Sequence, residues 1–529
     1  MFRLRCVLLL LAVTLVETNL MSCPCHAKDE SVGCAGEVKG LRVQIDAEVK
    51  LEEDIGQPFG SVFEAVDGNG RVIVGACLSD SYTMFGPAAE RNRLHCFVID
   101  NKSTPCAEVL PKPFPEIPAS RLVVLAGRLF AVPRMRLSPQ AVELEGAEWK
   151  VSSAAVELAC ENFGGAQEVD GQELLFSKQG VVYGDRVVFK PEKGFEAKYF
   201  YYYSEGVLIA FRYGDTDSGV KSLVRAYKWR PTQDAVVLED AFASAELGID
   251  YPLTFGTVGG RIVFALNSEP EVWALDGTFR RIFRGDARES WQAYCAMPFY
   301  DKLIIGQYPS GSLYETDGVS VVPFQTPLPM LTDWPREAQS IAVYRGELYA
   351  GLWPWGWVYR LRGSKWELAF RVVPQVPIRD EIAPYSKACE RAGLINNHWG
   401  QRVNSLVVHD NSLFASSMNK GGDPRGSAFV DSVSAYGSVT RYTLPGSLGT
   451  KLTPGVPYAL RIVVSERLAI LTVDGAVVDV CRGDFSSVAE LKGISWGAGI
   501  GGKFRGVIQR QQGWLTVEGG DPKPLPSHK

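Results

Sequence analysis

Short runs of apolar residues that follow a tight turn recur along most of this 529-residue chain. In each run a turn residue, usually glycine, precedes three or four apolar residues and then a second glycine or alanine. The turns lie at or near positions 70, 127, 206, 260, 302, 346 and 411. Apolar runs bounded by turn residues are typical of buried β-strands entered from a hairpin. The pattern therefore predicts a chain rich in short antiparallel strands.

The spacing of these turns indicates how the strands are grouped. Successive turns are 57, 79, 54, 42, 44 and 65 residues apart, and the shorter intervals match the roughly 40 to 50 residues of a four-stranded repeat. Two neighbouring repeats, Tyr300–Tyr314 and Tyr344–Tyr359, align closely. In these features the chain resembles the β-propeller superfamily, which implies an all-β fold built from four-stranded blades.

We expect seven blades over residues 58–446, with six or eight as alternatives. The 79-residue interval holds an extra strand pair at Gly180–Phe189, which is either an insertion or an additional compressed blade. Pro374 and Pro377 precede a segment with a short helical pattern that ends at glycine, so a helical insertion is expected near residues 378–393.

A different pattern begins near Ser447. Apolar runs follow one another closely, and Asp474-Gly475 between two of them is a strong hairpin signal. Residues 447–516 resemble the second half of a laminin-G-like, concanavalin A-type β-sandwich. The segment is a truncated sandwich, a sandwich completed by residues 35–55, or a strand cap on the propeller. Residues 28–57 form an N-terminal segment that is a candidate closing strand, and residues 517–529 are expected to be a flexible tail.

The first residues predict export. Arg3 and Arg5 precede an apolar run that ends at Val16, which is too short to span a bilayer and fits a secretory signal peptide of residues 1–27. Cleavage after Ala27 is the first expectation, and lipid attachment at Cys23 is the alternative. The protein is thus expected to be secreted, periplasmic or on the cell surface, without a transmembrane segment.

Cysteine usage bears on that compartment. Cleavage after Ala27 leaves an even set of cysteines, which in an oxidising compartment predicts disulfides. Cys77 and Cys96 are expected on neighbouring strands and are the first candidate pair. The alternative is that most of the thiols are free and buried. The remaining cysteines are Cys34, Cys77, Cys96, Cys106, Cys160, Cys295, Cys389 and Cys481.

Charge and histidine content restrict the classes of partner. The 55 basic and 60 acidic residues are interspersed and give a formal net charge of −5, which argues against nucleic acid and anionic membrane surfaces. The five histidines form no zinc motif, and no cofactor is expected. Asp215–Gly219 could bind calcium through its carboxylates, but it lacks the other ligands of an EF-hand loop and also reads as a plain hairpin turn.

The residues that could bind a ligand or take part in catalysis fall in two kinds of loop. In propellers as a family, the loops that enter each innermost strand and the loops between the second and third strands lie at one face, a rule applied here by analogy. The rule collects aromatic and charged side chains: Asp286, Arg288, Glu289, Trp291, Tyr308, Asp333, Trp334, Arg336, Glu337, Trp353, Trp355, Trp357, Asn397, His398, Trp399 and Arg402.

Flat aromatic rings beside hydrogen-bonding charges are suited to sugars, which have apolar CH faces and flanking hydroxyls. We therefore expect a carbohydrate or glycoconjugate ligand, although tryptophans of this kind also commonly pack between blades. The residues expected to bind it are Trp291, Tyr308, Trp334, Arg336, Trp353, Trp355, Trp357 and Trp399.

Two alternatives remain open. A polysaccharide-degrading enzyme would use the same face. A hydrolase needs two carboxylates about 5 to 9.5 Å apart, from Glu289, Asp333 and Glu337, whereas a lyase needs a base and positive charge, from His398 and Arg402. A protein-interaction scaffold is the second alternative. The sequence leaves the oligomeric state open.

Overall fold

The computed structural model is all-β, as the sequence predicts, and its described residues form nine sheets and two short 3-10 helices, η2 (Leu238–Asp240) and η5 (Ser486–Glu490). The described residues are 41–79, 81–83, 86–87, 91–100, 104–115, 117, 120–133, 141–151, 163–177, 180–203, 206–214, 219–231, 233, 235–286, 290–329, 336–374, 401–418, 437–517 and 520–528.

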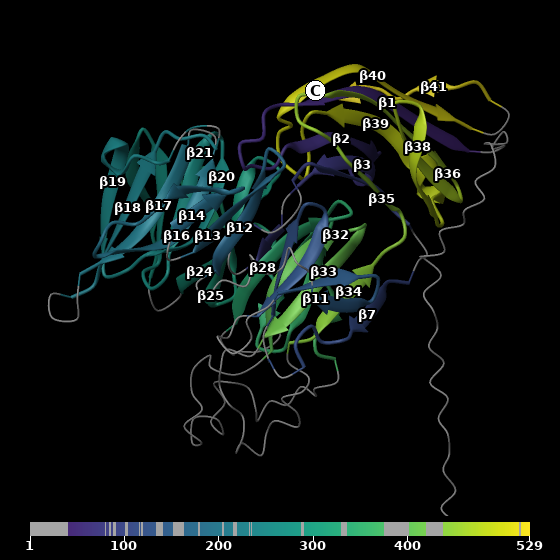
Figure 1. Cartoon of the computed structure of the whole chain (residues 1–529). Helices are drawn as coiled ribbons and strands as arrows, with labels where there is room; N and C mark the ends of the chain where they lie inside the picture. The colour runs from purple at the N-terminus through teal and green to yellow at the C-terminus, as the bar shows by residue number, and fades with distance from the viewer. Residues whose placement is uncertain are drawn as a thin grey trace, which may run out of the picture. The chain divides into compact units, whose positions relative to one another are not determined.

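Seven of these sheets contain four neighbouring antiparallel strands, which in six of the seven follow one another in the chain; Figure 1 labels many of these strands. The first three comprise β8 (Ser120–Leu125), β9 (Arg128–Pro133), β10 (Val142–Glu145) and β11 (Glu148–Val151); β12 (Phe163–Val169), β13 (Gln172–Ser177), β14 (Gly180–Tyr183) and β15 (Arg186–Phe189); and β16 (Phe195–Tyr203), β17 (Gly206–Tyr213), β18 (Lys221–Tyr227) and β19 (Ala241–Gly248).

The next two comprise β20 (Pro252–Val258), β21 (Arg261–Leu266), β22 (Glu271–Asp276) and β23 (Thr278–Arg284); and β24 (Ser290–Phe299), β25 (Lys302–Pro309), β26 (Leu313–Thr316) and β27 (Val321–Pro323). The last two comprise β28 (Glu337–Tyr344), β29 (Glu347–Trp353), β30 (Trp357–Arg362) and β31 (Lys365–Arg371), extended beside β28 by β4 (Ser81–Thr83) and β5 (Gly86–Pro87); and β32 (Arg402–His409), β33 (Ser412–Met418) and β34 (Val439–Thr443) with β7 (Cys106–Leu110).

The first strand of each of these sheets is called its inner strand below. Sheets that follow one another in the chain are in contact, with an inner strand on at least one side, and β32 of the last sheet contacts β8 of the first. The ring is also closed at its outer edge, because β7 precedes β8 in the chain yet pairs with β34 of the last sheet, with Leu110 opposite Val439. A closed ring of four-stranded sheets is the β-propeller fold.

The other two sheets form a β-sandwich whose strands come from both ends of the described chain. The first sandwich sheet has the order β38 (Ala476–Arg482), β37 (Leu468–Val473), β36 (Pro457–Ser465), β1 (Arg42–Leu51), β40 (Gly506–Thr516), β41 (Lys523–Pro524). The second has the order β35 (Ser447–Lys451), β6 (Arg93–Val98), β3 (Val72–Leu78), β2 (Gly60–Asp67), β39 (Leu491–Trp496), β42 (Ser527–His528).

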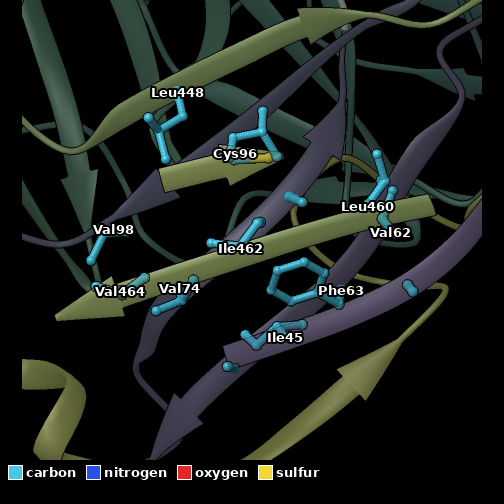
Figure 2. Close-up of a cluster of buried hydrophobic side chains, with 14 of the residues drawn as sticks. Ile45, Val62, Phe63, Val74, Cys96, Val98, Leu448, Leu460, Ile462 and Val464 are labelled. Atoms are coloured by element: carbon cyan, nitrogen blue, oxygen red, sulfur yellow. The ribbon is translucent and has the colours of Figure 1, made fainter. Parts of the chain in front are cut away.

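Alternation along the strands builds the core of this sandwich. In β1 the residues Val43, Ile45, Ala47 and Val49 are buried, while the residues between them are partly exposed. Since successive side chains of a strand point to opposite faces, one face of the first sandwich sheet is apolar. Figure 2 shows this face meeting the apolar face of the second sheet, with side chains of both in one cluster: Ile45, Leu460, Ile462 and Val464 with Phe63, Val74, Cys96, Val98 and Leu448.

The sandwich changes several assignments made from the sequence. The apolar run after Gly70 is β3 of the second sandwich sheet and not part of a blade, although its local pattern matches the blade hairpins. The strand pair at Gly180–Phe189 is β14 and β15, half of a sheet of its own. Of the three alternatives for residues 447–516, completion by residues 35–55 is met in part: β1 pairs with both β36 and β40, but β2, β3 and β6, which follow residue 55, also belong to the sandwich.

The C-terminal residues also differ from the expectation of a flexible tail. Lys523–Pro524 pairs with β40, and Ser527–His528 pairs in parallel with β39. Leu525 between them is 8% exposed and belongs to the sandwich core. A buried apolar residue holds this segment in place.

The predicted Cys77–Cys96 disulfide is wrong. The two residues lie on adjacent strands, but Cys77 pairs with His95 and Cys96 pairs with Ala76, so the cysteines are one residue out of register. Since this offset places side chains on opposite faces of a sheet, Cys96 lies in the sandwich core and Cys77 faces the blade residues. Both thiols are free and buried. Among the described cysteines, Cys295 and Cys481 are also free.

Several expectations concern residues outside the described part of the chain: the signal peptide of residues 1–27, lipid attachment at Cys23, the helical insertion at 378–393 and the carboxylates of Asp215 and Asp217. Within the described ranges, no helix is long and apolar enough to cross a membrane. The same ranges contain no group of three or more acidic, histidine or cysteine side chains arranged to hold a metal ion.

Candidate functional site

Three consecutive inner strands, β24, β28 and β32, share one register at their beginnings. Gln292 lies opposite Tyr308, Glu337 opposite Trp353, and Arg402 opposite Met418. In each strand a register shift follows, between Ala293 and Cys295, Ala338 and Ser340, and Val403 and Ser405. Gln292, Glu337 and Arg402 are therefore structurally equivalent positions.

The register shifts leave one extra residue in each strand: Tyr294, Gln339 and Asn404. A β-bulge locally bends its strand and re-aims the extra side chain, and bulges are frequent near functional sites. All three extra residues are polar, and Gln339 and Asn404 have no exposed surface. The repeated bulge thus brings polar groups to equivalent places on three neighbouring sheets.

The centre of the site is an ion pair between two equivalent positions. Arg402 donates from Nη1 to Oε2 of Glu337 over 2.8 Å and from Nη2 to Oε1 over 2.9 Å. Both side chains have 0% exposed surface. Gln339 also donates to Oε2 of Glu337, and the Tyr294 hydroxyl lies 3.4 Å from Oε1. The carboxylate is therefore enclosed by donors from all three sheets.

Aromatic rings surround this pair. The Arg402 guanidinium carbon lies 5.9 Å from the centre of the Trp353 ring, within the range of a cation–π contact. Tyr308 meets Trp353 edge to face at 6.4 Å between ring centres. These two rings, Tyr294 and Met418 form one buried cluster. The ion pair is thus embedded in apolar surroundings that exclude water.

Hydrogen bonds extend the polar centre to the neighbouring sheets. Gln292 donates to Asn267 on the β20 side over 3.2 Å and accepts from the Tyr294 hydroxyl over 2.6 Å. On the other side, Asn404 donates to the backbone oxygen of Ser120 at the start of β8 over 2.6 Å. Polar contacts therefore join the beginnings of the inner strands across consecutive sheets.

The other described aromatic candidates are packing residues. Trp355 is 2% exposed and Trp357 4% exposed, and both belong to a core cluster with residues of β25 and β29. Tyr308 and Trp353 are 4% and 0% exposed. Because stacking on a sugar needs an accessible ring face, these four rings cannot act as a stacking surface in this conformation.

Two arginines donate hydrogen bonds to backbone oxygens. Arg336 donates to the backbone oxygens of Ser310 and Pro329, and Arg371 donates to the backbone oxygen of Trp355 over 3.2 Å. Burial lowers the pKa of both guanidinium groups from their usual range. Arg336 is 3% exposed, so its guanidinium links backbone segments instead of facing solvent.

Seven further sequence candidates lie outside the described residues: Arg288, Glu289, Asp333, Trp334, Asn397, His398 and Trp399. For Trp291 the structure describes the backbone in β24 but not the side chain. The described site also contains residues that the sequence analysis did not single out, namely Gln292, Tyr294, Gln339 and Asn404.

An internal alignment could have found two of them, Gln339 and Asn404. Asp333–Ser340 reads Asp-Trp-Pro-Arg-Glu-Ala-Gln-Ser, and His398–Ser405 reads His-Trp-Gly-Gln-Arg-Val-Asn-Ser. The two segments share tryptophan at the second position, a charged residue at the fifth, an amide at the seventh and serine at the eighth. The observed register confirms that Glu337 and Arg402 are equivalent.

The opposite ends of the inner strands are in contact with the sandwich or with the segment before β2. Gln57 donates to the backbone oxygen of Tyr202 at the end of β16 over 2.9 Å. Asn411, in the turn after β32, donates to Asp479 of β38 over 2.8 Å. Some of the hairpin turns that the sequence repeats thus contact other parts of the protein, and the site described above lies at the other ends of the strands.

No family model matches the chain, and no curated protein matches it. Solved structures similar to it include a catalytically inactive virginiamycin B lyase from Staphylococcus aureus, with 10% identity, a TM-score of 0.26 and coverage of 76% of this chain and 99% of the other. A β-propeller domain from Myceliophteria thermophila has 9% identity, a TM-score of 0.28 and coverage of 64% and 100%.

The extracellular domain of a putative one-component system from B. thetaiotaomicron has 10% identity, a TM-score of 0.24 and coverage of 90% of this chain and 78% of the other. Likenesses at this level carry no inference about ligand or chemistry. The sheet order and the closure of the ring by β7 identify the fold as a β-propeller joined to a β-sandwich.

Proposed function

We propose that this is an exported seven-bladed β-propeller protein that binds a glycan or a glycosylated surface through the segments preceding β24, β28 and β32. The observation that carries the proposal is the contact between Glu337 and Arg402, which joins the beginnings of two inner strands. Because the end of β16 and the turn after β32 contact other parts of the protein, we place the ligand at the beginnings of the inner strands. We further propose that the sandwich is of the laminin-G-like type.

Chain length ties the predicted ligand-binding residues to this contact. Trp334 precedes Glu337 by three residues, and Trp399 precedes Arg402 by three residues. Since an extended chain spans at most about 3.6 Å per residue, each tryptophan Cα lies within about 11 Å of the Cα of its anchored residue. Glu289 stands in the same relation to Gln292. Each of the three segments is thus tethered by a short length of chain to an anchored strand.

The geometry favours a positioning role for Glu337 and Arg402. Both oxygens of Glu337 accept hydrogen bonds from Arg402, and neither side chain reaches solvent, so the carboxylate is occupied in holding the two strands together. A bidentate arginine–carboxylate pair imposes geometric specificity as well as attraction. The ligand contacts would come from Trp291, Trp334 and Trp399, with polar groups beside them.

The tethering also supports an enzyme as the second candidate. Glu289, Asp333 and His398 each precede an anchored residue by three or four positions in the sequence, and these are the groups that hydrolysis or elimination of a polysaccharide would require. In this version Glu289 and Asp333 would be the two carboxylates and His398 the base of a lyase, while Glu337 and Arg402 would hold the segments that carry them.

A glycan-array screen of the mature protein tests the proposal. We expect Trp334→Ala and Trp399→Ala to lose binding at least about tenfold, a free-energy loss of about 1.4 kcal/mol. Trp514→Ala, a partly exposed tryptophan of the sandwich, is the matched control and should bind as the wild type does. Product formation that disappears in Asp333→Asn would establish the enzyme. Absence of any glycan binding would refute both carbohydrate functions and leave a protein-interaction scaffold.

A further inference from the structure

The backbone of one residue, Ile500, links the sandwich to the propeller beside a buried carboxylate. The Ile500 N–H donates to Oε1 of Glu64 on β2 over 2.6 Å, and the Ile500 oxygen accepts from the N–H of Tyr300 over 3.1 Å. Tyr300 lies in the turn between β24 and β25. Any movement that separates Ile500 from Glu64 therefore also disturbs the contact with this blade.

The turn that carries Ile500 packs closely on Glu64. The Ser61 side chain accepts from the N–H of Gly501 over 2.9 Å, which holds the turn to the start of β2. At Gly499 an added Cβ would lie 2.4 Å from the Glu64 carboxylate, so the backbone of the turn covers this group directly. Glu64 is only 6% exposed. The carboxylate thus has almost no access to water while the turn is in place.

Within the described part of the chain, the titratable groups that interact with Glu64 carry no compensating positive charge. Cys77 on β3 and Tyr300 in the β24–β25 turn are the titratable groups that interact with its charge, and burial raises the pKa of both above their usual range. Both are therefore neutral near pH 7. Burial raises the pKa of Glu64 from 4.5 to about 7, although the Ile500 N–H acts in the opposite direction. Desolvation of the charged form is the dominant effect.

We propose that Glu64 is a protonation-sensitive latch between the sandwich and the blade β24–β27. The neutral carboxyl keeps the turn of residues 499–501 closed over it. The ionised carboxylate favours an open arrangement in which the turn moves away and water reaches the charge. The inner strand of the same blade carries Gln292 and Tyr294 at its other end, so the latch acts on a strand of the candidate site. The proposal does not depend on what the site binds.

The sign and size of the effect follow from linkage. A carboxyl whose pKa is higher in the closed state favours closure most at low pH, and this advantage is lost progressively as the pH rises from about 4.5 through 7. With a pKa of 4.5 in the open state and about 7 in the closed state, the opening equilibrium increases about tenfold between pH 6 and pH 8.

Hydrogen exchange measured by mass spectrometry on the full mature chain tests the latch. After correction for intrinsic exchange, we expect peptides covering residues 497–504 and the β24–β25 turn to open about tenfold more at pH 8 than at pH 6, with a midpoint near pH 7. Glu64→Gln should remove this dependence, because its amide cannot ionise. Glu490→Gln, which changes an exposed carboxylate of the sandwich, should behave like the wild type.

Two results would overturn the latch: exchange in the wild type that does not depend on pH between 6 and 8, or a pH dependence that persists in Glu64→Gln. Because the wild-type profile is informative without any variant, poor folding of Glu64→Gln leaves the test intact. Gly499→Ala provides a second variant, since its methyl group would push the turn away from the carboxylate. It should raise exchange at pH 6 in the same peptides, and unchanged exchange there would also contradict the latch.

Discussion

Removing one member of the Glu337–Arg402 pair should destabilise the protein strongly. Arg402→Met keeps an unbranched side chain of similar length but takes away both hydrogen bonds and the positive charge. The Glu337 carboxylate, which has no exposed surface, would then be buried without its charge partner. Such changes typically cost about 3–5 kcal/mol of unfolding free energy, and the cation–π contact with Trp353 adds to the loss.

The pair also predicts how the variants combine. Glu337→Gln alone leaves a buried guanidinium and should be destabilising as well, whereas the double variant Glu337→Gln/Arg402→Met removes both charges together. The double variant should therefore be more stable than the sum of the single effects, with a coupling free energy of about 3 kcal/mol, at the upper end for contacting residues. Arg402→Lys should be intermediate, because an ammonium cannot reproduce the bidentate geometry.

Urea unfolding followed by tryptophan fluorescence, together with hydrogen exchange of β28 and β32, measures these changes. Lys150→Met is the control, since Lys150 and its partner Glu145 are each 52% exposed and the loss of this surface pair should have no measurable effect. Single-variant losses below about 1 kcal/mol, or additive effects in the double variant, would refute the reasoning that the pair is fully desolvated and fastens two blades together.

Two further predictions concern backbone geometry and the thiols. Gly346 has φ of 70° and an added Cβ would lie 2.3 Å from the ring of Phe97, so Gly346→Val should cost more than about 2 kcal/mol in urea unfolding; a loss within 0.5 kcal/mol would contradict the observed contact. Cys77 and Cys96 should react with a thiol reagent only after unfolding, as peptide mapping without a reductant would show; a peptide that links the two would contradict the observed register.

The local pattern of the sequence was sufficient to predict the strands. The runs after positions 127, 206, 260, 302, 346 and 411 are the second strands β9, β17, β21, β25, β29 and β33 of their sheets. Apolar residues beside a turn specify a hairpin from neighbouring residues alone, so these elements could be read without any tertiary information. The four-stranded grouping and the all-β class follow from the same signal.

The partners of each hairpin could not be read in this way. The run after Gly70 has the same local pattern, yet β3 pairs with β6 in the sandwich, and the sandwich is completed by β39, more than 400 residues further along the chain. Likewise, β7 closes the propeller although it lies over 300 residues before its partner β34. An alternating pattern states that a strand has one apolar face but does not state which distant strand will cover it.

The candidate site likewise has features that the local sequence predicts and features that depend on contacts between distant strands. The sequence by itself determined that Glu337, Arg402 and Trp353 belong to the segments around the starts of the inner strands. Only the tertiary structure decided that Glu337 and Arg402 pair without solvent, that the Trp353 ring packs under the guanidinium, and that Glu64 lies beneath Ile500. Hairpin formation depends on neighbours in the chain, whereas burial, ion pairing and pKa depend on surfaces that approach only when distant strands have packed.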